Sequence, residues 1–327
     1  MPEHPFDTIM NISLGFTLSR ALQVIAELGV ADALDDTPQS ADELARSTGT
    51  HSESLNRCLR LLSAHGVFQK RGAAYVHTAA SQLLRTDNPM SMRSWCRMQG
   101  FTPLWHIWEQ MDYTVKTGRS AEKGLPGGSF WDYLNGHLEH GRIFNDAMTG
   151  KTSGQAAGLL AAYDFSKFRS IADIGGGNGQ LLRALLAANP SSTGVLFDLP
   201  DVIAQAQPAD RLTLQAGSFF EGGLPVCDAY ILMQILHDWS DEESQKILTS
   251  IRCGAPANAK LLVVEFLVPH DNTPSWSLLL DMVMMVELTG RERTEAEFRE
   301  MLARTGFRLD RAIDAGFNTF LLEASVA

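Results

Sequence analysis

The clearest sign of function in the sequence is a glycine-rich turn. Residues 175–179 hold four glycines, between an apolar run at 170–174 and leucines that recur at helical spacing. This order predicts a strand, a tight turn and a helix. Such a turn presents backbone N–H groups and a helix N-terminus, which a nucleotide can approach closely because glycine has no Cβ.

The spacing separates this turn from two commoner glycine loops. A dinucleotide loop needs glycine or alanine where Gln180 stands, and a phosphate loop needs a lysine that does not follow here. Asp198 ends a second apolar strand about 20 residues past the glycines, and an acid there suits the hydroxyl pair of a ribose. The alternative is an ordinary tight turn, with Asp198 as a strand-end cap.

A histidine stands at the same edge of the predicted sheet. His237 follows a strand at 229–236, and the carboxyl ends of parallel strands meet where the glycine turn also lies. A histidine titrates at about pH 6.5, so it suits work as a base, and it then needs an acceptor on its other ring nitrogen. Glu265, at the end of another strand, and Glu292, just before a helix, are placed for this. The residues alone equally allow a core or helix-entry histidine, and an ion pair of Glu292 with a neighbouring arginine.

The second half of the chain alternates strands and helices. Strands are predicted at 170–174, 193–199, 212–216, 228–233, 260–266, 307–312 and 317–323, with helices at 180–188, 241–252 and 294–304. Ser240 with Glu243, and Thr294 with Glu297, fit capping boxes, so both glutamates are expected to be structural. The alternation predicts an α/β fold with a doubly wound, Rossmann-like sheet and ligands at the carboxyl ends of the strands.

Residues from about 10 to 88 predict a compact helical unit. Its expected elements are an apolar helix over 18–28 ended by Gly29, helices opened by capping boxes at 40–43 and 50–53, and a two-stranded wing at 67–70 and 74–77. This is the order of a winged helix, a fold that often binds DNA. Here the second helix carries Glu53 beside Arg57 and Arg60, and the chain has a net charge of −11, so we expect no nucleic-acid partner.

Composition places the chain among ordinary globular proteins of about two domains, with 45% hydrophobic and 20% charged residues in 327. There is no long apolar run free of charge and no signal-peptide pattern, so we expect no membrane partner. Four scattered cysteines fit the cytoplasm and argue against a disulfide frame or a zinc site. No carboxylate cluster with ligand spacing is visible, so no metal is expected.

Four motifs follow one another along the chain. They are Asp173-Ile174-Gly175-Gly176-Gly177-Asn178-Gly179, Phe197-Asp198-Leu199-Pro200, Leu236-His237-Asp238-Trp239-Ser240-Asp241 and Gly290-Arg291-Glu292-Arg293-Thr294. The ordered set resembles the S-adenosylmethionine (SAM)-dependent small-molecule O-methyltransferases, the family of plant caffeic acid O-methyltransferase and of bacterial natural-product tailoring enzymes. The resemblance implies a winged-helix dimerisation domain at 1–95, a helical linker contributing to the acceptor pocket at 96–163, and a class I, SAM-binding methyltransferase domain at 164–327. It also implies a homodimer formed through the first domain.

The resemblance assigns roles to single residues. It implies that His237 is the general base, flanked by Glu265 and Glu292. SAM, and its product S-adenosylhomocysteine (SAH), would be bound by Asp173, Gly175, Gly177, Asp198, Leu199, Gly217, Ser218, Phe219 and Met233. The acceptor would be bound by Trp105, Trp131, His140, Phe144, Met148, Asp238, Met284 and Met285. Phe144 and Met148 can face one volume because they lie four residues apart on a helix, whereas the first three are equally well explained as core.

Three positions depart from the family pattern. Ser218 replaces an acid that contacts the adenine amine, although its hydroxyl can accept one hydrogen bond. Met233 replaces a common lysine, and the asparagine of the plant acceptor pocket has no match near 287–289. Methionines at 282, 284 and 285 suggest an adaptable apolar wall. The acceptor is therefore expected to differ from plant phenylpropanoids.

Methyl transfer from a sulfonium is an in-line displacement, in which the protein positions the nucleophile and removes its proton. We therefore expect transfer to a hydroxyl of an aromatic small molecule, a secondary metabolite. Carboxyl- or N-methylation is one alternative, and hydroxylation or decarboxylation with the same cofactor is another. A winged-helix regulator that senses a nucleotide ligand is the non-enzymatic alternative.

Overall fold

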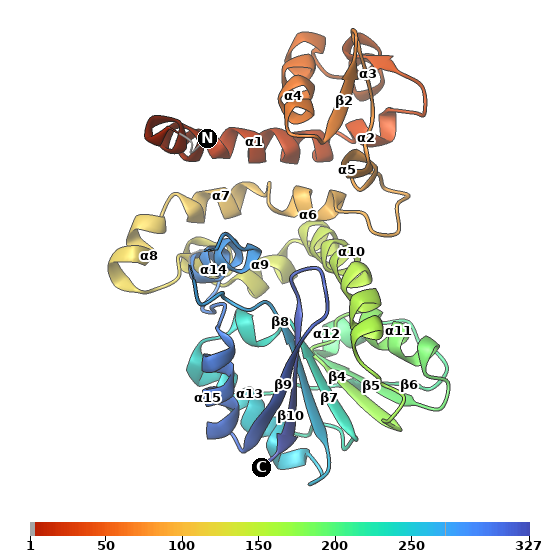
Figure 1. Cartoon of the computed structure of the whole chain (residues 1–327), viewed down its shortest axis with the longest axis vertical. Coiled ribbons are helices and arrows are strands. Elements are labelled where there is room, and N and C mark those ends of the chain that lie inside the picture. Colours follow the sequence, from red (N-terminus) through yellow and green to blue (C-terminus); the bar gives the residue numbers. More distant parts are fainter. Residues whose placement is uncertain (1–3, 272) are drawn as a thin grey trace. The chain divides into compact units, whose positions relative to one another are not determined.

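The computed structural model describes residues 4–271 and 273–327. The first three residues, on which part of the signal-peptide expectation rests, lie outside this range. The described chain forms two compact units (Figure 1). The N-terminal unit holds the residues up to Trp105 together with His137–Lys151, and the C-terminal unit holds His106–Gly136 and Thr152–Ala327.

Two helices, α7 (Thr102–Trp108) and α10 (Leu138–Ala162), run from one unit into the other. The stretch at 96–163 is therefore divided between the two units, and its description as a linker that contributes to the acceptor pocket stays a prediction.

The N-terminal unit is a winged helix around a small apolar core. Besides its parts of α7 and α10, it contains α1 (Pro5–Glu27), α2 (Val30–Ala33), β1 (Gln39–Ser40), α3 (Ala41–Thr48), α4 (Ser52–Ala64), β2 (Phe68–Arg71), β3 (Ala74–His77), α5 (Ala79–Gln82) and α6 (Arg93–Met98). The predicted wing is present and gains a third strand, because β1 pairs with β3 to give the antiparallel order β1-β3-β2. Leu44, Leu59 and Tyr75 are fully buried between these elements.

Local sequence rules hold at two of the three predicted helix ends. Gly29 adopts a left-handed φ of 65° directly after α1, and Ser40 forms a complete capping box with Glu43 at the start of α3. The box predicted at 50–53 is wrong. Helix α4 has His51 as its N-cap, so Glu53 falls one position too early for the reciprocal bond, and the Thr50 hydroxyl lies 3.0 Å from that of Thr48 instead.

Helix α1 leaves much of its apolar surface exposed. Within the described residues it is the one helix that is long and apolar enough to cross a membrane, judged by length and composition alone. Phe6, Ile12 and Phe16 are more than half exposed, at 64%, 73% and 58%. Helices covered by a partner show the same properties, so the absence of a membrane partner stays a prediction.

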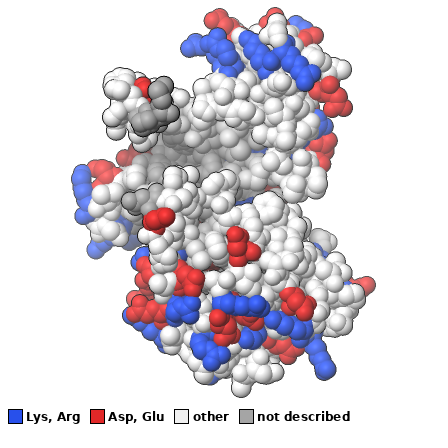
Figure 2. All heavy atoms as spheres, in the orientation of Figure 1, with Lys and Arg blue, Asp and Glu red and all other residues white. Residues whose placement is uncertain are grey.

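Charge on the outside of the winged helix is mixed. Arg57 and Arg60 on α4, and Lys70 and Arg71 on β2, are exposed. Figure 2 shows lysine and arginine side chains at this end of the N-terminal unit, with acidic side chains beside them. The face in this view is therefore not the uniformly basic surface that a DNA duplex would require.

The C-terminal unit is built on a mixed sheet in the order β6-β5-β4-β7-β8-β10-β9. Its strands are β4 (Ser170–Ile174), β5 (Thr193–Asp198), β6 (Leu212–Ala216), β7 (Ala229–Met233), β8 (Lys260–Glu265), β9 (Phe307–Asp314) and β10 (Phe320–Val326). Strands β4 to β8 run parallel, and β10 and β9 complete the sheet as an antiparallel pair. The order reverses at β4, so the carboxyl ends of β4, β5, β7 and β8 share one edge, where a doubly wound sheet binds its ligand.

Helices cover both faces of this sheet (Figure 1). Besides its parts of α7 and α10, this unit contains α8 (Met111–Thr117), η1 (Glu122–Gly124), α9 (Phe130–Gly136), α11 (Gln180–Ala188), α12 (Pro200–Ile203), η2 (Leu236–Asp238), α13 (Asp241–Gly254), α14 (Trp276–Glu287) and α15 (Glu295–Arg304). One core joins the sheet to α13 and α15, and a second joins it to α10 and α11. The middle strands read as continuous apolar runs because they are buried on both faces.

The predicted strands agree closely with the observed ones except at the C-terminus. The last strand begins at Phe320 and not at 317, because Phe317 and Asn318 adopt positive φ angles of 52° and 58° after Gly316 and form the tip of the β9–β10 hairpin. The predicted capping boxes at Ser240 and Thr294 are both complete.

The two capping sites of the N-terminal unit form a matched pair for a stability test. Ser40→Ala removes a formed capping box and should lower the free energy of unfolding by about 1 kcal/mol. Thr50→Ala removes a hydroxyl that caps no helix and should cost clearly less. Urea unfolding of both variants beside the wild type measures the difference, and an equal loss would contradict the assignment of His51 as the N-cap of α4.

Candidate active site

The glycine turn after β4 is forced by close packing. Gly175, Gly177 and Gly179 have φ angles of 72°, 58° and 76°, which residues with a side chain rarely adopt. A Cβ on Gly175 would stand 2.7 Å from a methyl group of Ile235, whereas one on Gly177 would meet nothing within 4 Å. The turn is therefore tight on its protein side and open at Gly177.

Two acids meet at this turn. Asp198, at the end of β5, accepts hydrogen bonds from the N–H groups of Gly177 at 2.8 Å and Leu199 at 2.7 Å. Asp173 is buried, and its Oδ2 accepts no hydrogen bond from the described residues. Burial, reinforced by the charge of Asp198, raises the pKa of Asp173 to about 7. Buried polar atoms normally have partners, so an unpaired acceptor beside a fixed carboxylate fits a ligand with several N–H or O–H donors.

The third strand brings more of the predicted cofactor residues to the same edge. The N–H of Gly217 donates to the carbonyl of Asp198 at 3.0 Å, and a Cβ on Gly217 would overlap the ring of Phe197. Phe219 stands edge-on to Trp239 and close to Gly175. Ser218 accepts a hydrogen bond from the N–H of Phe220, so its hydroxyl also orders its own loop. Met233 ends β7 at this edge, and Leu199 follows β5 half exposed.

The loop that carries His237 is held by Glu265. The Oε1 atom of Glu265 accepts hydrogen bonds from the backbone N–H groups of Ile235, Leu236 and His237 at 3.1, 2.9 and 3.3 Å. Because the carboxylate is fully buried, these three donors replace its water. They fix the backbone of His237, and so they also fix the point from which its side chain extends.

A second buried charge, Arg293, holds the other side of the loop. Its guanidinium is 1% exposed and donates to the carbonyl groups of Leu236 at 2.7 Å and Trp239 at 2.9 Å. Gly290 passes so close that a Cβ there would overlap the carbonyl oxygen of His237. Sequence reasoning missed Arg293 as a functional residue, because an arginine next to Glu292 reads as a simple ion-pair partner.

The ring of His237 lies among three carboxylates. Its Nδ1 is 2.8 Å from Glu292 Oε1 and 3.6 Å from Glu265 Oε2, and its Nε2 is 3.4 Å from Asp238 Oδ1. Burial alone would lower the pKa of His237, but the negative charges of Glu265, Glu292 and Asp238 outweigh it and raise that pKa to about 9. Burial likewise raises the pKa of Glu265. The site therefore holds protons more firmly than free side chains do.

Glu292 is not paired with the arginines beside it. Arg291 pairs with Glu297 and Asp241, and Arg293 pairs with Asp241. The backbone N–H of Glu292 donates to Asp281 on α14 at 2.9 Å, a contact that sequence reasoning also missed. The carboxylate of Glu292 is thereby free to bind the histidine.

A buried cluster that no sequence spacing reveals lies at this site. His237, Glu265 and Glu292 offer ligand atoms that all lie within 4.8 Å of one another. Its members are separated by 28 and 27 residues in sequence, and the sheet, not local spacing, assembles them. Metal-free transfer stays a prediction.

The predicted acceptor residues are divided between the two units. His140 stacks on Phe101 with ring centres 3.8 Å apart, and the guanidinium of Arg20 lies 5.8 Å from the centre of Trp105. Phe144 and Met148 are half-buried on α10, in the same unit. In the C-terminal unit Trp131 stands edge-on to Phe130, Met284 and half-buried Met285 lie on α14, and Asp238 lies beside His237.

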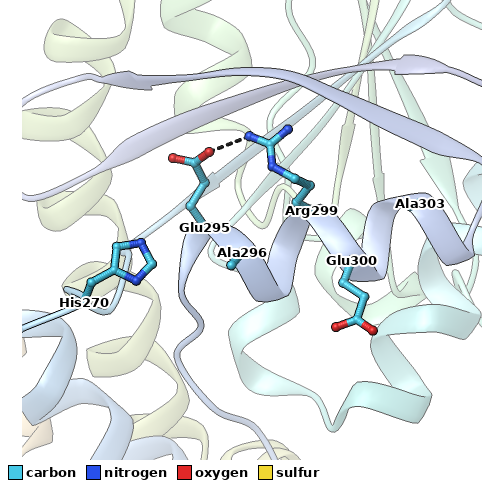
Figure 3. A pocket seen from close by; sticks show the side chains of 6 residues that line it. All are labelled: His270, Glu295, Ala296, Arg299, Glu300 and Ala303. Atoms are coloured by element: carbon cyan, nitrogen blue, oxygen red, sulfur yellow. Dashed lines mark hydrogen bonds and ion pairs between the residues drawn. The ribbon is translucent and has the colours of Figure 1, made fainter.

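Two further features lie outside the predicted set. Glu287, at the end of α14, is buried and accepts a hydrogen bond from the indole N–H of Trp108 at 2.7 Å, and burial raises its pKa to about 7. A hollow on the surface of α15 is lined by His270, Glu295, Ala296, Arg299, Glu300 and Ala303 (Figure 3). None of the predicted site residues lines this hollow.

Comparison with protein families agrees with both units. The O-methyltransferase domain matches residues 108–308, and the O-methyltransferase dimerisation domain matches residues 10–87.

Individual relatives match over nearly their whole length. The phenazine O-methyltransferase PhzM of Lysobacter antibioticus is 36% identical, over 97% of this chain and 95% of its own. The mitomycin biosynthesis 6-O-methyltransferase of Streptomyces lavendulae is 34% identical, over 95% and 91%. The crystal structure of CalO1, a methyltransferase in calicheamicin biosynthesis, in its SAH-bound form has a TM-score of 0.90 at 30% identity, and the match covers 99% of this chain and 100% of that one. The chain therefore belongs to the SAM-dependent small-molecule O-methyltransferases, with the dimerisation domain of that family in its N-terminal part.

Proposed function

We propose that this enzyme transfers a methyl group from SAM to a hydroxyl of an aromatic natural product, with His237 as the general base. The observation that carries the proposal is the buried hydrogen bond of 2.8 Å between His237 Nδ1 and Glu292. It leaves Nε2 as the ring nitrogen that can take a proton from a substrate. Family membership sets aside the regulator, hydroxylase and decarboxylase alternatives, whereas carboxyl- and N-methylation stay open as choices of acceptor.

The residues at the glycine turn fit SAM, which supplies a methyl group on a positively charged sulfur. Asp198 would accept the ribose hydroxyls, and the unpaired Oδ2 of Asp173 would accept from the polar end of the molecule. Gly175, Gly177, Leu199 and Gly217 would shape the backbone around it. Ser218 and Phe219 would border the adenine, and Met233 would lie beside them.

The raised pKa of His237 suits a phenolic acceptor. A phenol titrates at about pH 10, so a base whose pKa is raised toward that value has a larger driving force for taking the phenolic proton. The carboxylate of Glu292 keeps the Nδ1 proton in place and stabilises the imidazolium that forms. Glu265 would act as a positioning residue, since it binds the loop backbone through Oε1 and lies 3.6 Å from Nδ1 through Oε2.

The acceptor class is inferred from the relatives and from the aromatic side chains. The relatives described above act, by their names, on a phenazine and in mitomycin biosynthesis. Trp105, Trp131, His140, Phe144, Met148, Met284 and Met285 would supply aromatic and apolar contacts, and Asp238 lies beside the proposed base. We also propose a homodimer in which the exposed apolar surface of α1 is covered by the second copy. Location in the cytoplasm stays a prediction.

Replacing the base tests the proposal most directly. His237→Ala should lower the rate of methyl transfer from labelled SAM by about 100-fold or more for phenolic acceptors, while SAM binding measured by calorimetry stays the same. His65→Ala removes an exposed histidine and serves as the control. An unchanged rate in His237→Ala would remove this residue as the base and favour an acceptor that is already ionised, such as a carboxylate.

The pH dependence follows from the raised pKa of His237. Only the neutral imidazole can accept a proton, so kcat/KM for a phenolic acceptor should rise about tenfold per pH unit and level off near pH 9. Glu292→Gln removes one of the charges that raise this pKa, so its profile should level off at a lower pH. A wild-type profile that is flat between pH 6 and 9 would be incompatible with His237 acting as the base.

A further inference from the structure

Two carboxylate oxygens beside His237 accept no hydrogen bond from the described residues. They are Oε2 of Glu265 and Oε2 of Glu292, and the two residues are 0% and 2% exposed. Buried charged oxygens are costly when they are left without a donor or a cation. Both oxygens belong to carboxylates that face the same imidazole, so a cation bound among the three side chains would neutralise this buried negative charge.

The distances in this cluster approach those of a metal site. Zinc binds nitrogen and oxygen ligands at about 2.0–2.2 Å in tetrahedral geometry, which places neighbouring ligand atoms about 3.3–3.6 Å apart. His237 Nδ1 is already 3.6 Å from Glu265 Oε2. Its distance of 2.8 Å to Glu292 Oε1 would have to widen by only some tenths of an ångström. The Oε1 atom of Glu265 can keep its three backbone N–H bonds throughout, so the loop need not move.

We propose that His237, Glu265 and Glu292 form a binding site for Zn²⁺, and that zinc bound there inhibits methyl transfer. One imidazole and two carboxylates suit zinc, and the two negative charges balance the ion. Magnesium and calcium require about six or more oxygen ligands, which this buried cluster of one imidazole and two carboxylates does not offer. The inhibitory half of the proposal rests on the proposed role of His237 as the base.

The inhibition follows from which nitrogen of the imidazole ring carries the proton. Zinc takes the lone pair of Nδ1, and the single proton of the neutral ring, which this nitrogen shares with Glu292, moves to Nε2. A neutral imidazole carries one N–H, which must then be on Nε2. A protonated Nε2 cannot accept the proton of the acceptor hydroxyl, so the base is blocked while the fold is unchanged.

Binding is tested on the metal-stripped, full-length enzyme without any acceptor. Calorimetry with Zn²⁺, and visible absorption with Co²⁺ as a coloured substitute, should show one tight site per chain. His237→Ala and Glu292→Gln should each weaken that site by more than about tenfold, since loss of even an outer-shell partner costs 10–100-fold. Thermal unfolding of both variants checks that they are folded.

The surface hollow on α15 supplies the matched control. His270 lies there with Glu295 and Glu300, and Figure 3 shows that Glu295 points to Arg299, with which it forms an ion pair of 2.6 Å. These side chains are reached by solvent, and both acids are already in ion pairs, Glu295 with Arg299 and Glu300 with Arg304. His270→Ala should therefore leave zinc affinity unchanged. Loss of the site in this variant, or its full retention in His237→Ala, would overturn the assignment.

Activity then tests the inhibition. Zinc at the occupancy found by calorimetry should abolish transfer, EDTA should restore it, and Mg²⁺ at the same concentration should have no effect. Full occupancy with an unchanged rate would overturn the inhibitory role. This outcome is distinct from failure of the proposed function, because the binding readout needs no acceptor and the loss of activity in His237→Ala is measured without metal.

Discussion

The bond set made by Glu265 is the interaction on which the rest of the active site depends. A carboxylate at the end of β8 accepts three consecutive backbone N–H groups from the loop after β7, and that loop carries His237. The two strands are parallel neighbours in register, with Met233 opposite Val264, so the acid and the loop meet without adjustment. Since the carboxylate is fully buried, its hydrogen bonds do not compete with water. The position of His237 is thus set by the sheet itself, and Arg293 holds its loop from the opposite side.

The residues proposed to bind SAM lie at the same edge of the sheet as the residues around His237. Asp173 and Asp198 end β4 and β5, Met233 ends β7, and Glu265 ends β8, so four adjacent parallel strands deliver their last polar or flexible side chain to one rim. All three acids are buried enough to have their pKa raised, including Asp198 and Glu265, which accept hydrogen bonds from backbone N–H groups. A rim of this kind attracts cations and hydrogen-bond donors, and a sulfonium nucleoside is both.

Much of this architecture was predictable from the sequence, because local and global signals agree there. The strands of the C-terminal unit are buried on both faces and read as apolar runs, and the glycine turn, the Ser240 and Thr294 caps and the wing all have short-range causes. The failures have non-local causes. The cap at 50–53 depended on where α4 begins, and the last strand was shifted by residues with positive φ at a hairpin tip.

The composition of the site was only partly predictable. Motif order brought His237, Glu265 and Glu292 into consideration, but no spacing in the sequence reveals that their ligand atoms converge. Arg293 and Asp281 act through backbone groups, and a sequence carries no signal for which carbonyl or N–H a side chain will find. The acceptor residues stay a prediction, because the candidates lie on helices whose aromatic side chains also build a core.

Gly290 has a consequence for anyone who wishes to change the range of acceptors by directed evolution. The segment from α14 to Glu292 joins the methionines of α14 to the glutamate that binds His237, so it is an obvious target for a mutant library. Any side chain at position 290 would occupy the space of the His237 carbonyl oxygen. Substitutions at this position would mostly yield variants in which the loop of His237 is displaced, even where they improve binding of a new acceptor. A library that fixes glycine there and varies 282, 284 and 285 would leave the loop of His237 in place while it changes the methionine side chains of α14.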